Sequence, residues 1–136
     1  RSRGLGDVYK RQAQTIGHDT HNIVVVGKTP SDMFKAFRAI ENIRGGIVVV
    51  DNGKTECVVE LREAGLMSSK SFREVYLEVK CLEKFFLDRG GEDSSTQLMY
   101  ISLLTLPVIP EIRITPKGVV DVVSRSIISP IAFVRR

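Results

Sequence analysis

Residues 17–27, with the sequence GHDTHNIVVVG, place a cluster of polar side chains directly before a short apolar run. The run at residues 23–26 is β-branched and is closed by a glycine, which predicts a buried strand. Because a strand held in the core has fixed ends, we expect the polar cluster at its start to be held in place. Both histidines of the chain, His18 and His21, lie in this cluster. The cluster is therefore the first candidate for a functional site.

The length and composition indicate one globular domain, since the chain has 136 residues of which 43% are hydrophobic. The sequence has no apolar run of about eighteen residues, so we expect no membrane span. Residues 1–12 hold four Lys or Arg and one Asp, and account for most of the net charge of +4. The remainder is nearly neutral, which argues against nucleic-acid binding. We interpret residues 1–12 as a non-native or disordered leader, with a flexible basic arm as the alternative, and residues 13–136 as the domain.

The two cysteines, Cys57 and Cys81, do not have the spacing of a metal site. We predict that they are buried thiols rather than a disulfide, which is typical of a reducing compartment. This interpretation places the protein in the cytoplasm.

The first half of the domain has clear helix and turn signals. Residues 29–32, TPSD, predict the start of a helix that ends at Gly45-Gly46. Residues 47–50 and 55–61 predict two strands, and Asn52-Gly53 between them favours a tight hairpin turn. A second helix is expected from a capping box of Ser71 and Glu74 to Gly90-Gly91. Its apolar stripe is predicted to pack on the sheet, and consists of Phe72, Val75, Val79, Leu82 and Phe86.

The second half is less regular. Residues 92–96 predict a polar loop, and residues 98–109 predict a short buried helix or turn followed by extended chain, because two prolines exclude a long helix. Residues 111–115 and 119–122 are expected to be strands, and residues 127–134 an edge strand that tolerates Pro130. The expected fold class is α+β, a mixed sheet of about five to seven strands packed by two main helices in a single layer pair.

Three separated stretches resemble the C-terminal domain of bacterial and archaeal adenine deaminases. They are the polar cluster with its strand (residues 18–27), the AGLMS loop (residues 64–68) and a closing segment with the sequences LPVIPE (residues 106–111), IT (residues 114–115) and KGVVDV (residues 117–122). Two departures stand out in this resemblance. Thr20 occupies a place where the family has serine, and Arg62-Glu63 replaces a proline and an aliphatic residue.

The resemblance implies a metal-dependent hydrolase of the amidohydrolase superfamily that converts adenine and water to hypoxanthine and ammonia in purine salvage. In that superfamily an N-terminal TIM barrel carries the metal, here expected to be manganese or iron, and the sequence contains no such barrel. We therefore expect a C-terminal fragment that is inactive alone. Its expected partners are the barrel domain, adenine and further copies in a homo-oligomer. The alternative is a stand-alone, non-catalytic binding or oligomerisation module.

The polar cluster allows three interpretations. His18, Asp19 and His21 offer metal-ligand atoms, but positions i and i+3 of a strand face opposite ways, so only a turn would bring both imidazoles together. The cluster can also be purely structural, capping backbone groups at a domain interface. We favour a third role, in which no residue of this chain is catalytic or binds metal. The lip of the active site, or the layer behind the metal ligands, is then formed by His18, Asp19, Thr20, His21 and Asn22.

Overall fold

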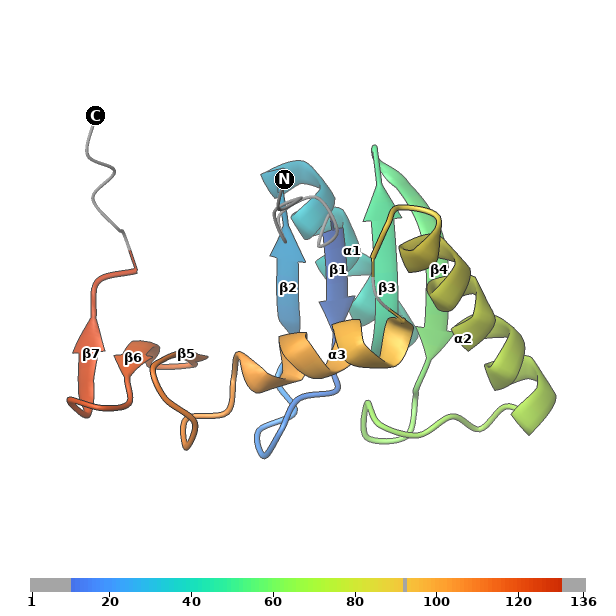
Figure 1. Ribbon diagram of the computed structural model, residues 1–136. Coiled ribbons are helices and arrows are strands. Elements are labelled where there is room, and N and C mark those ends of the chain that lie inside the picture. The colour runs from blue at the N-terminus through green and yellow to red at the C-terminus, as the bar shows by residue number, and fades with distance from the viewer. Residues whose placement is uncertain (1–10, 92, 131–136) are drawn as a thin grey trace.

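The computed structural model describes residues 11–91 and 93–130 (Figure 1). Within these residues it has three helices and seven strands, which confirms the α+β class. None of the helices in this part of the chain is long and apolar enough to span a membrane. In chain order the elements are β1 (Arg11–Gln14), β2 (Val24–Gly27), α1 (Pro30–Ile43), β3 (Gly46–Asp51), β4 (Lys54–Glu60), α2 (Phe72–Leu87), α3 (Ser94–Leu103), β5 (Ile112–Thr115), β6 (Gly118–Asp121) and β7 (Ser126–Ile128).

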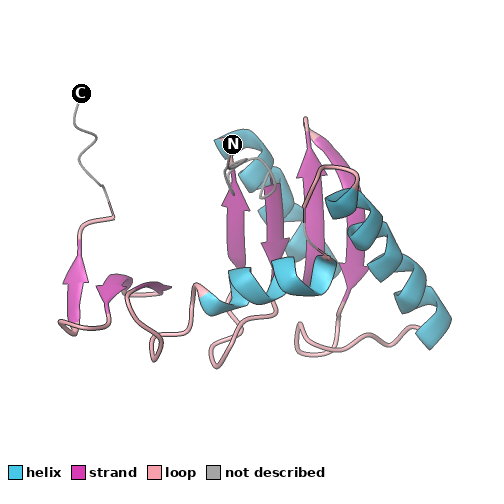
Figure 2. Cartoon of the chain, viewed as in Figure 1, coloured by secondary structure: helices cyan, strands magenta, loops and turns pink. Residues whose placement is uncertain are grey.

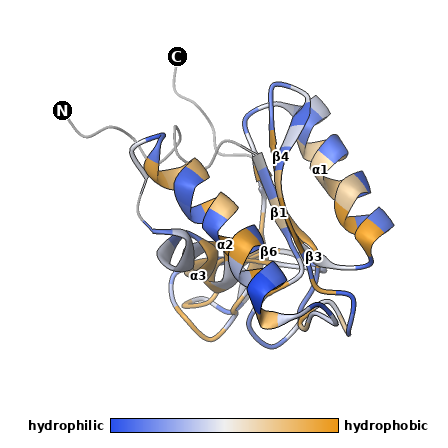
Figure 3. Cartoon of the chain, turned by 90° about the vertical axis from the view of Figure 1, so that its right-hand side faces the viewer, coloured by the Kyte–Doolittle hydropathy of each residue, from blue (hydrophilic) through white to orange (hydrophobic). Residues whose placement is uncertain are grey.

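The strands form two antiparallel sheets rather than one mixed sheet. The larger has the order β2-β1-β3-β4 and the smaller the order β5-β6-β7. Seen edge-on in Figure 3, the larger sheet has α1 on one face and α2 with α3 on the other. The helices therefore cover both faces, where the sequence predicts a single layer pair.

The central strand β1 is not anticipated from the sequence. It includes Arg11 and Gln12, so the predicted boundary of the leader at residue 12 is wrong for these two residues, while residues 1–10 lie outside the described part. Gln12 and Gln14 are buried on the same face of β1. Gln12 Nε2 donates to Gln14 Oε1 at 2.7 Å, and Gln14 Nε2 donates to the carbonyl of Ile16 at 2.6 Å. A polar strand is tolerated at the centre of the sheet because these amides satisfy one another and the backbone.

Strand β2 is found where the sequence predicts it, but it is not a buried strand. Among the described residues it pairs only with β1, and it lies at the edge of the larger sheet. Only Val24 is buried, and residues 25–27 are half-buried. The reason is that β1 takes the inner position beside β3.

Helix α1 and the β3–β4 hairpin agree with the sequence analysis. Asn52 and Gly53 adopt the positive φ angles of the predicted turn. Thr29 does not cap the helix backbone, and its hydroxyl instead donates to Asp32 Oδ2 at 2.7 Å. Asp32 Oδ1 accepts from the N–H of Gly53 at 2.8 Å, so this buried carboxylate holds the hairpin turn against the start of α1.

Two hydrophobic clusters stabilise the larger sheet, one on each face. The smaller, against α1, contains Ala13, Ala36, Ile40, Val48 and Val50. The larger, against α2, contains Ile47, Val49, Cys57, Val59, Leu61, Leu82, Phe85 and Phe86. Alternate residues at positions 57, 59 and 61, along β4 and directly after it, therefore face the core on the α2 side.

Helix α2 begins with the predicted capping box of Ser71 and Glu74. Its apolar stripe is core only in its second half. Leu82 and Phe86 are buried, whereas Phe72 is 87% exposed and Val79 is 37% exposed. Figure 1 shows the physical reason, because the first turns of α2 extend beyond the end of β4 and leave the sheet.

The prediction of two free thiols is wrong, because Cys57 and Cys81 form a disulfide. Cys57 lies on the inward face of β4 and Cys81 on α2, which packs against that face, so their Cα atoms are 5.9 Å apart. That distance is within the usual range for a disulfide. The argument that placed the protein in the cytoplasm from its cysteines loses its basis.

Helix α3 starts earlier than predicted, since residues 94–96 are helical rather than loop. The cause is Asp93, whose side chain accepts from the N–H of Thr96 at 3.1 Å and caps the helix. The predicted short helix is confirmed up to Leu103. After it, β5, β6 and β7 form the smaller sheet, which lies beside the end of α3 (Figure 2). Residues 131–134 of the predicted last strand lie outside the described part.

Candidate functional site

The polar cluster lies in the loop of residues 15–23 that joins β1 to β2. Residues 18–20 form a turn, in which the N–H of Thr20 donates to the carbonyl of His18 at 2.8 Å. Asp19 and His21 adopt positive φ angles of 63° and 46°. The N–H of Gly17 donates to His21 Nδ1 at 3.5 Å. All five cluster residues are exposed, so the cluster is presented to solvent by a turn and is not held at the start of a buried strand.

The loop is anchored on one side by the AGLMS loop. Thr15 Oγ1 accepts from the N–H of Gly46 at 2.8 Å and donates to the carbonyl of Gly65 at 2.5 Å. A Cβ atom at Gly65 would lie 3.1 Å from Thr15 Oγ1, so the absence of a side chain permits this close approach. The second family-like stretch thus supports the backbone from which the polar cluster extends.

The loop is anchored on its other side by α3 and the segment after it. Ser102 Oγ donates to the carbonyl of Ile16 at 3.3 Å. A Cβ atom at Gly17 would lie 3.3 Å from Thr105 Oγ1, so the residue before the cluster packs closely against the chain that leaves α3. The N–H of Ile114 donates to the carbonyl of Leu104 at 2.9 Å and brings β5 to the same place. The AGLMS loop thus bonds to the start of the loop that carries the polar cluster, and Ile114 and Thr115 of the closing segment lie across a cleft from Thr20 and Asn22.

An ion-pair network fixes the chain between the AGLMS loop and α2. Lys70 Nζ bonds to Glu60 Oε2 at 2.8 Å and also to Glu78. Hydrogen bonds from Lys70 and Arg62 lower the pKa of the Glu60 carboxyl, and the carboxylates of Glu60 and Glu78 raise the pKa of Lys70. Both groups are therefore charged at neutral pH. Arg62, two residues after the end of β4, also bonds to Glu60 in this network.

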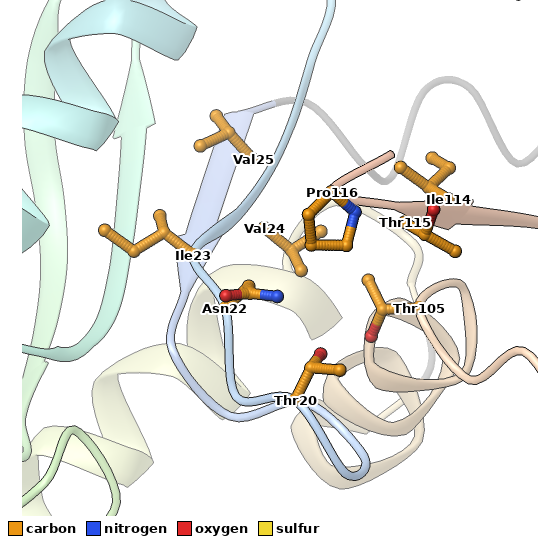
Figure 4. Close-up of a pocket in the computed structure, with 9 residues that line it drawn as sticks. All are labelled: Thr20, Asn22, Ile23, Val24, Val25, Thr105, Ile114, Thr115 and Pro116. Atoms are coloured by element: carbon orange, nitrogen blue, oxygen red, sulfur yellow. The ribbon is translucent and has the colours of Figure 1, made fainter. Parts of the chain in front are cut away.

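A cleft of about 490 Å³ opens between the polar cluster, β2 and the β5–β6 turn (Figure 4). None of its lining residues is charged. The cluster contributes Thr20 and Asn22, whereas His18, Asp19 and His21 are not among the lining residues. The full lining consists of Thr20, Asn22, Ile23, Val24, Val25, Thr105, Ile114, Thr115 and Pro116.

Only some of the residues that line the cleft could have been predicted from the sequence. Thr20 and Asn22 carry a visible signal, since they belong to a polar cluster before a strand. Thr105 and Thr115 carry none, because a threonine in an apolar segment gives no sign of which residues face it across the fold. Thr105 reaches the cleft from the segment after α3, and Thr115 reaches it from the end of β5 (Figure 4).

Metal-ligand atoms do not come together in the described part of the chain. Across residues 11–91 and 93–130, no group of three or more His, Cys, Asp or Glu side chains is arranged to hold a metal ion. The chemistry that the end of the sheet offers is therefore hydrogen bonding by imidazole, carboxylate, hydroxyl and amide groups beside apolar surface. Ile23, which is 41% exposed, and Met67, which is 64% exposed, contribute to that apolar surface.

The fold and the site together define an α+β domain whose distinctive segments gather at one end of a four-stranded sheet. The family model described as the adenine deaminase C-terminal domain matches residues 3–126, and the chain belongs to this family. The match includes residues 3–12, which are most of the segment interpreted above as a leader.

Curated relatives agree with the family. The adenine deaminase of Staphylothermus marinus is 47% identical over 120 residues, which are 88% of this chain and 20% of the relative. The adenine deaminase of Chelativorans sp. is 47% identical over 116 residues, which are 85% of this chain and 19% of the relative. The adenine deaminase of Clostridium acetobutylicum is 45% identical over 113 residues, which are 82% of this chain and 20% of the relative. The chain spans about a fifth of the length of these relatives.

Proposed function

We propose that this chain is the C-terminal domain of an adenine deaminase, an enzyme that hydrolyses adenine to hypoxanthine and ammonia in purine salvage. The end of the larger sheet, with the loop of residues 15–23 at its centre, faces the remainder of the enzyme beside the active site. Water supplies the oxygen of hypoxanthine, and the amino group of adenine leaves as ammonia.

The observation that carries the proposal is that segments far apart in the sequence, among them the AGLMS loop, hold the loop of residues 15–23. Thr15 bonds to Gly65, and Ser102 bonds to Ile16, so segments far apart in the sequence hold one loop between them. Side chains with hydrogen-bonding capacity lie beside exposed apolar residues on that loop and its neighbours. Exposed apolar surface next to polar groups is typical of a surface that contacts another domain or a ligand.

In this proposal the metal is bound by another part of the enzyme. A metal-bound water becomes a nucleophile at neutral pH only where several protein ligands hold the cation. The residues described for this chain supply no such group, so they do not fit a manganese or iron centre. We propose that the N-terminal part of the enzyme, a TIM barrel in the resembling family, binds the metal, and no step at the metal is derived from this domain.

The part of the polar cluster in this proposal is to position the substrate. His18 and His21 can donate or accept hydrogen bonds, and Asp19 can accept them from the exocyclic amino group of adenine. A misplacement of a bound substrate by about 1 Å can cost a hundredfold in rate. The cluster therefore affects the deamination rate without binding the metal.

The test uses His18→Ala, Asp19→Asn and His21→Ala in a version of the protein that includes the N-terminal part. Asparagine is chosen at position 19 because it tolerates the positive φ angle found there. We expect the rate of ammonia release to fall by about a hundredfold in at least one variant, with unchanged metal content. Asp88→Ala, an exposed carboxylate after α2, is the matched control and should leave the rate unchanged.

Two results would contradict this proposal. Wild-type rates in all three variants would mean that the cluster is structural. A loss of metal in proportion to the loss of rate would mean that the cluster contains metal ligands.

A further inference from the structure

The cleft beside β2 has the size and lining of a small-molecule site. Its volume of about 490 Å³ falls within the range of roughly 300–1,000 Å³ that is usual for such sites. The side chain of Val24 lines one side, and Ile114 and Pro116 line the other (Figure 4). Such walls favour a flat, apolar ring system.

Figure 4 shows Thr20, Asn22 and Thr105 near one another in the cleft. The hydroxyl of the fourth polar residue, Thr115, already donates to the carbonyl of Gly118 at 2.9 Å and accepts from the N–H of Lys117 at 3.2 Å. Thr105 is buried, and its hydroxyl donates to the carbonyl of Ser102 at 3.0 Å, which leaves its oxygen able to accept a hydrogen bond. Among the described residues, the side chains of Thr20 and Asn22 have no hydrogen-bond partner, and both are exposed. The cleft thus offers one amide and two hydroxyls to a ligand.

The chemistry of the lining selects a neutral ligand. Because none of the lining residues carries a charge, an anionic group would lose its hydration in the cleft without gaining a counter-charge. An asparagine amide can donate to one acceptor and accept from one donor at the same time, and this pattern matches the amino group and adjacent ring nitrogen of adenine. The aliphatic walls then cover the two faces of the ring.

We infer that this cleft binds a neutral purine base, with the Asn22 amide hydrogen-bonded to the edge of the ring and Thr20 and Thr105 beside it. The choice of adenine as the base rests on the proposed function. The site itself belongs wholly to this chain, and it lies on the surface that the proposed function places beside the active site. It would hold the base on the C-terminal domain before or after the reaction.

Binding can be measured on the 136-residue chain itself by titrating adenine and following backbone amide signals by NMR. For a ligand of this size in an open cleft we expect a dissociation constant of about 1 mM. The largest shifts should be at Thr20, Asn22 and Ile114. Asn22→Ala should weaken binding about tenfold, since it removes both hydrogen bonds to the ring edge.

The design includes two controls. Asn22 is exposed, so the variant should keep the wild-type amide spectrum outside the cleft, which shows that it folds. Thr55→Val removes an exposed hydroxyl from β4, at the opposite edge of the larger sheet, and should bind adenine like the wild type. Thr20→Val keeps the shape of the cleft and should weaken binding less than Asn22→Ala.

The inference is overturned if the cleft residues do not shift at about 10 mM adenine, or if Asn22→Ala binds as tightly as the wild type. Neither result touches the proposed function, because that is tested by ammonia release from a protein that includes the N-terminal part. Conversely, adenine binding by this chain would stand even if the longer protein acted on another base.

Discussion

Gly45 is the residue at which the packing of the AGLMS loop can be tested most directly. A Cβ atom there would lie 2.5 Å from the Cα atom of Gly65, and its φ of +125° is unfavourable for any side chain. We expect Gly45→Ala to lower the free energy of unfolding by about 3 kcal/mol, measured by urea denaturation. Gly53→Ala is the matched control, because Gly53 also has a positive φ but nothing within 4 Å of its Cβ position. It should cost only about 1 kcal/mol.

The comparison of the two glycines separates two effects. Equal losses at Gly45 and Gly53 would mean that backbone conformation alone explains the cost, and that the AGLMS loop does not pack tightly on the larger sheet. A larger loss at Gly45 would show the combined cost of crowding against Gly65 and of a φ of +125°, which differs from the φ of +73° at Gly53.

At the residue scale, the role predicted for His18 to Asn22 stays a prediction, and of these five residues only Thr20 and Asn22 line the cleft. All five lie in one exposed loop. Their exposure was not predicted, because the following β-branched run was interpreted as an inner strand. The residue types of a strand do not show whether it takes an inner or an edge position in its sheet, and here β1 takes the inner position beside β3.

At the scale of elements, the two halves of α2 should respond differently to truncation. Leu82→Ala removes a fully buried side chain of the larger hydrophobic cluster and should cost about 2–5 kcal/mol of unfolding free energy. Phe72→Ala removes a larger side chain that is 87% exposed and should cost less than about 0.5 kcal/mol. Chemical denaturation of both variants checks this. A large loss for Phe72→Ala would show that the first turn of α2 is covered in solution.

The disulfide fixes α2 to β4 and should stabilise the folded chain by restricting the unfolded chain. Because the two cysteines are separated by 24 positions in the sequence, the chain-entropy estimate is about 3 kcal/mol. We therefore expect the double variant Cys57→Ala with Cys81→Ala to unfold at a lower urea concentration than the oxidised protein. Reductant should lower the stability of the wild type and leave the double variant unchanged. An equal effect of reductant on both proteins would exclude the disulfide as the cause.

Helix α3 should weaken in acid because of its cap. Hydroxyls of Ser95 and Thr96 and the N–H of Thr96 donate to the carboxylate of Asp93, which lowers its pKa from 3.8 to about 2. A depressed pKa in the folded state stabilises the protein fully above the unfolded value and loses this effect as the pH falls through the folded value. The wild type should therefore lose stability between about pH 4 and pH 2 more steeply than Asp93→Asn, whose amide caps without titrating. Parallel pH profiles of unfolding would contradict this assignment.

The elements that the sequence failed to predict share a physical cause. β1 contains two glutamines that become acceptable in the core only because they bond to each other and to the backbone of Ile16, which is a tertiary arrangement. The start of α3 depends on Asp93, which lies in a run of polar residues that also suits a loop. By contrast, α1, the hairpin turn and the capping box of α2 depend on neighbours in the sequence, and these were predicted.

At the scale of the whole molecule, the larger sheet acts as a platform for its own connections. β1 and β4 end, and β2 and β3 begin, at the same end of this sheet, so the loops there come close together without a long connection (Figure 1). The polar cluster lies in the loop between β1 and β2 and the AGLMS loop follows β4, whereas the closing segment includes β5 and β6 of the smaller sheet. The fold can thus keep its core while this end contacts other parts of a longer enzyme.

If the N-terminal part of the enzyme binds the metal, as we propose, the chain alone should be inactive. Purified protein, supplied with manganese or iron, should release no ammonia from adenine. The reason is that a hydrolytic centre needs about three protein ligands to hold the cation and lower the pKa of its water, and residues 11–91 and 93–130 contain no such group. A full-length relative assayed in parallel is the positive control. Metal-dependent ammonia release by the purified chain, abolished by His18→Ala or His21→Ala, would show that the polar cluster is a catalytic centre and that its assignment to substrate positioning is wrong.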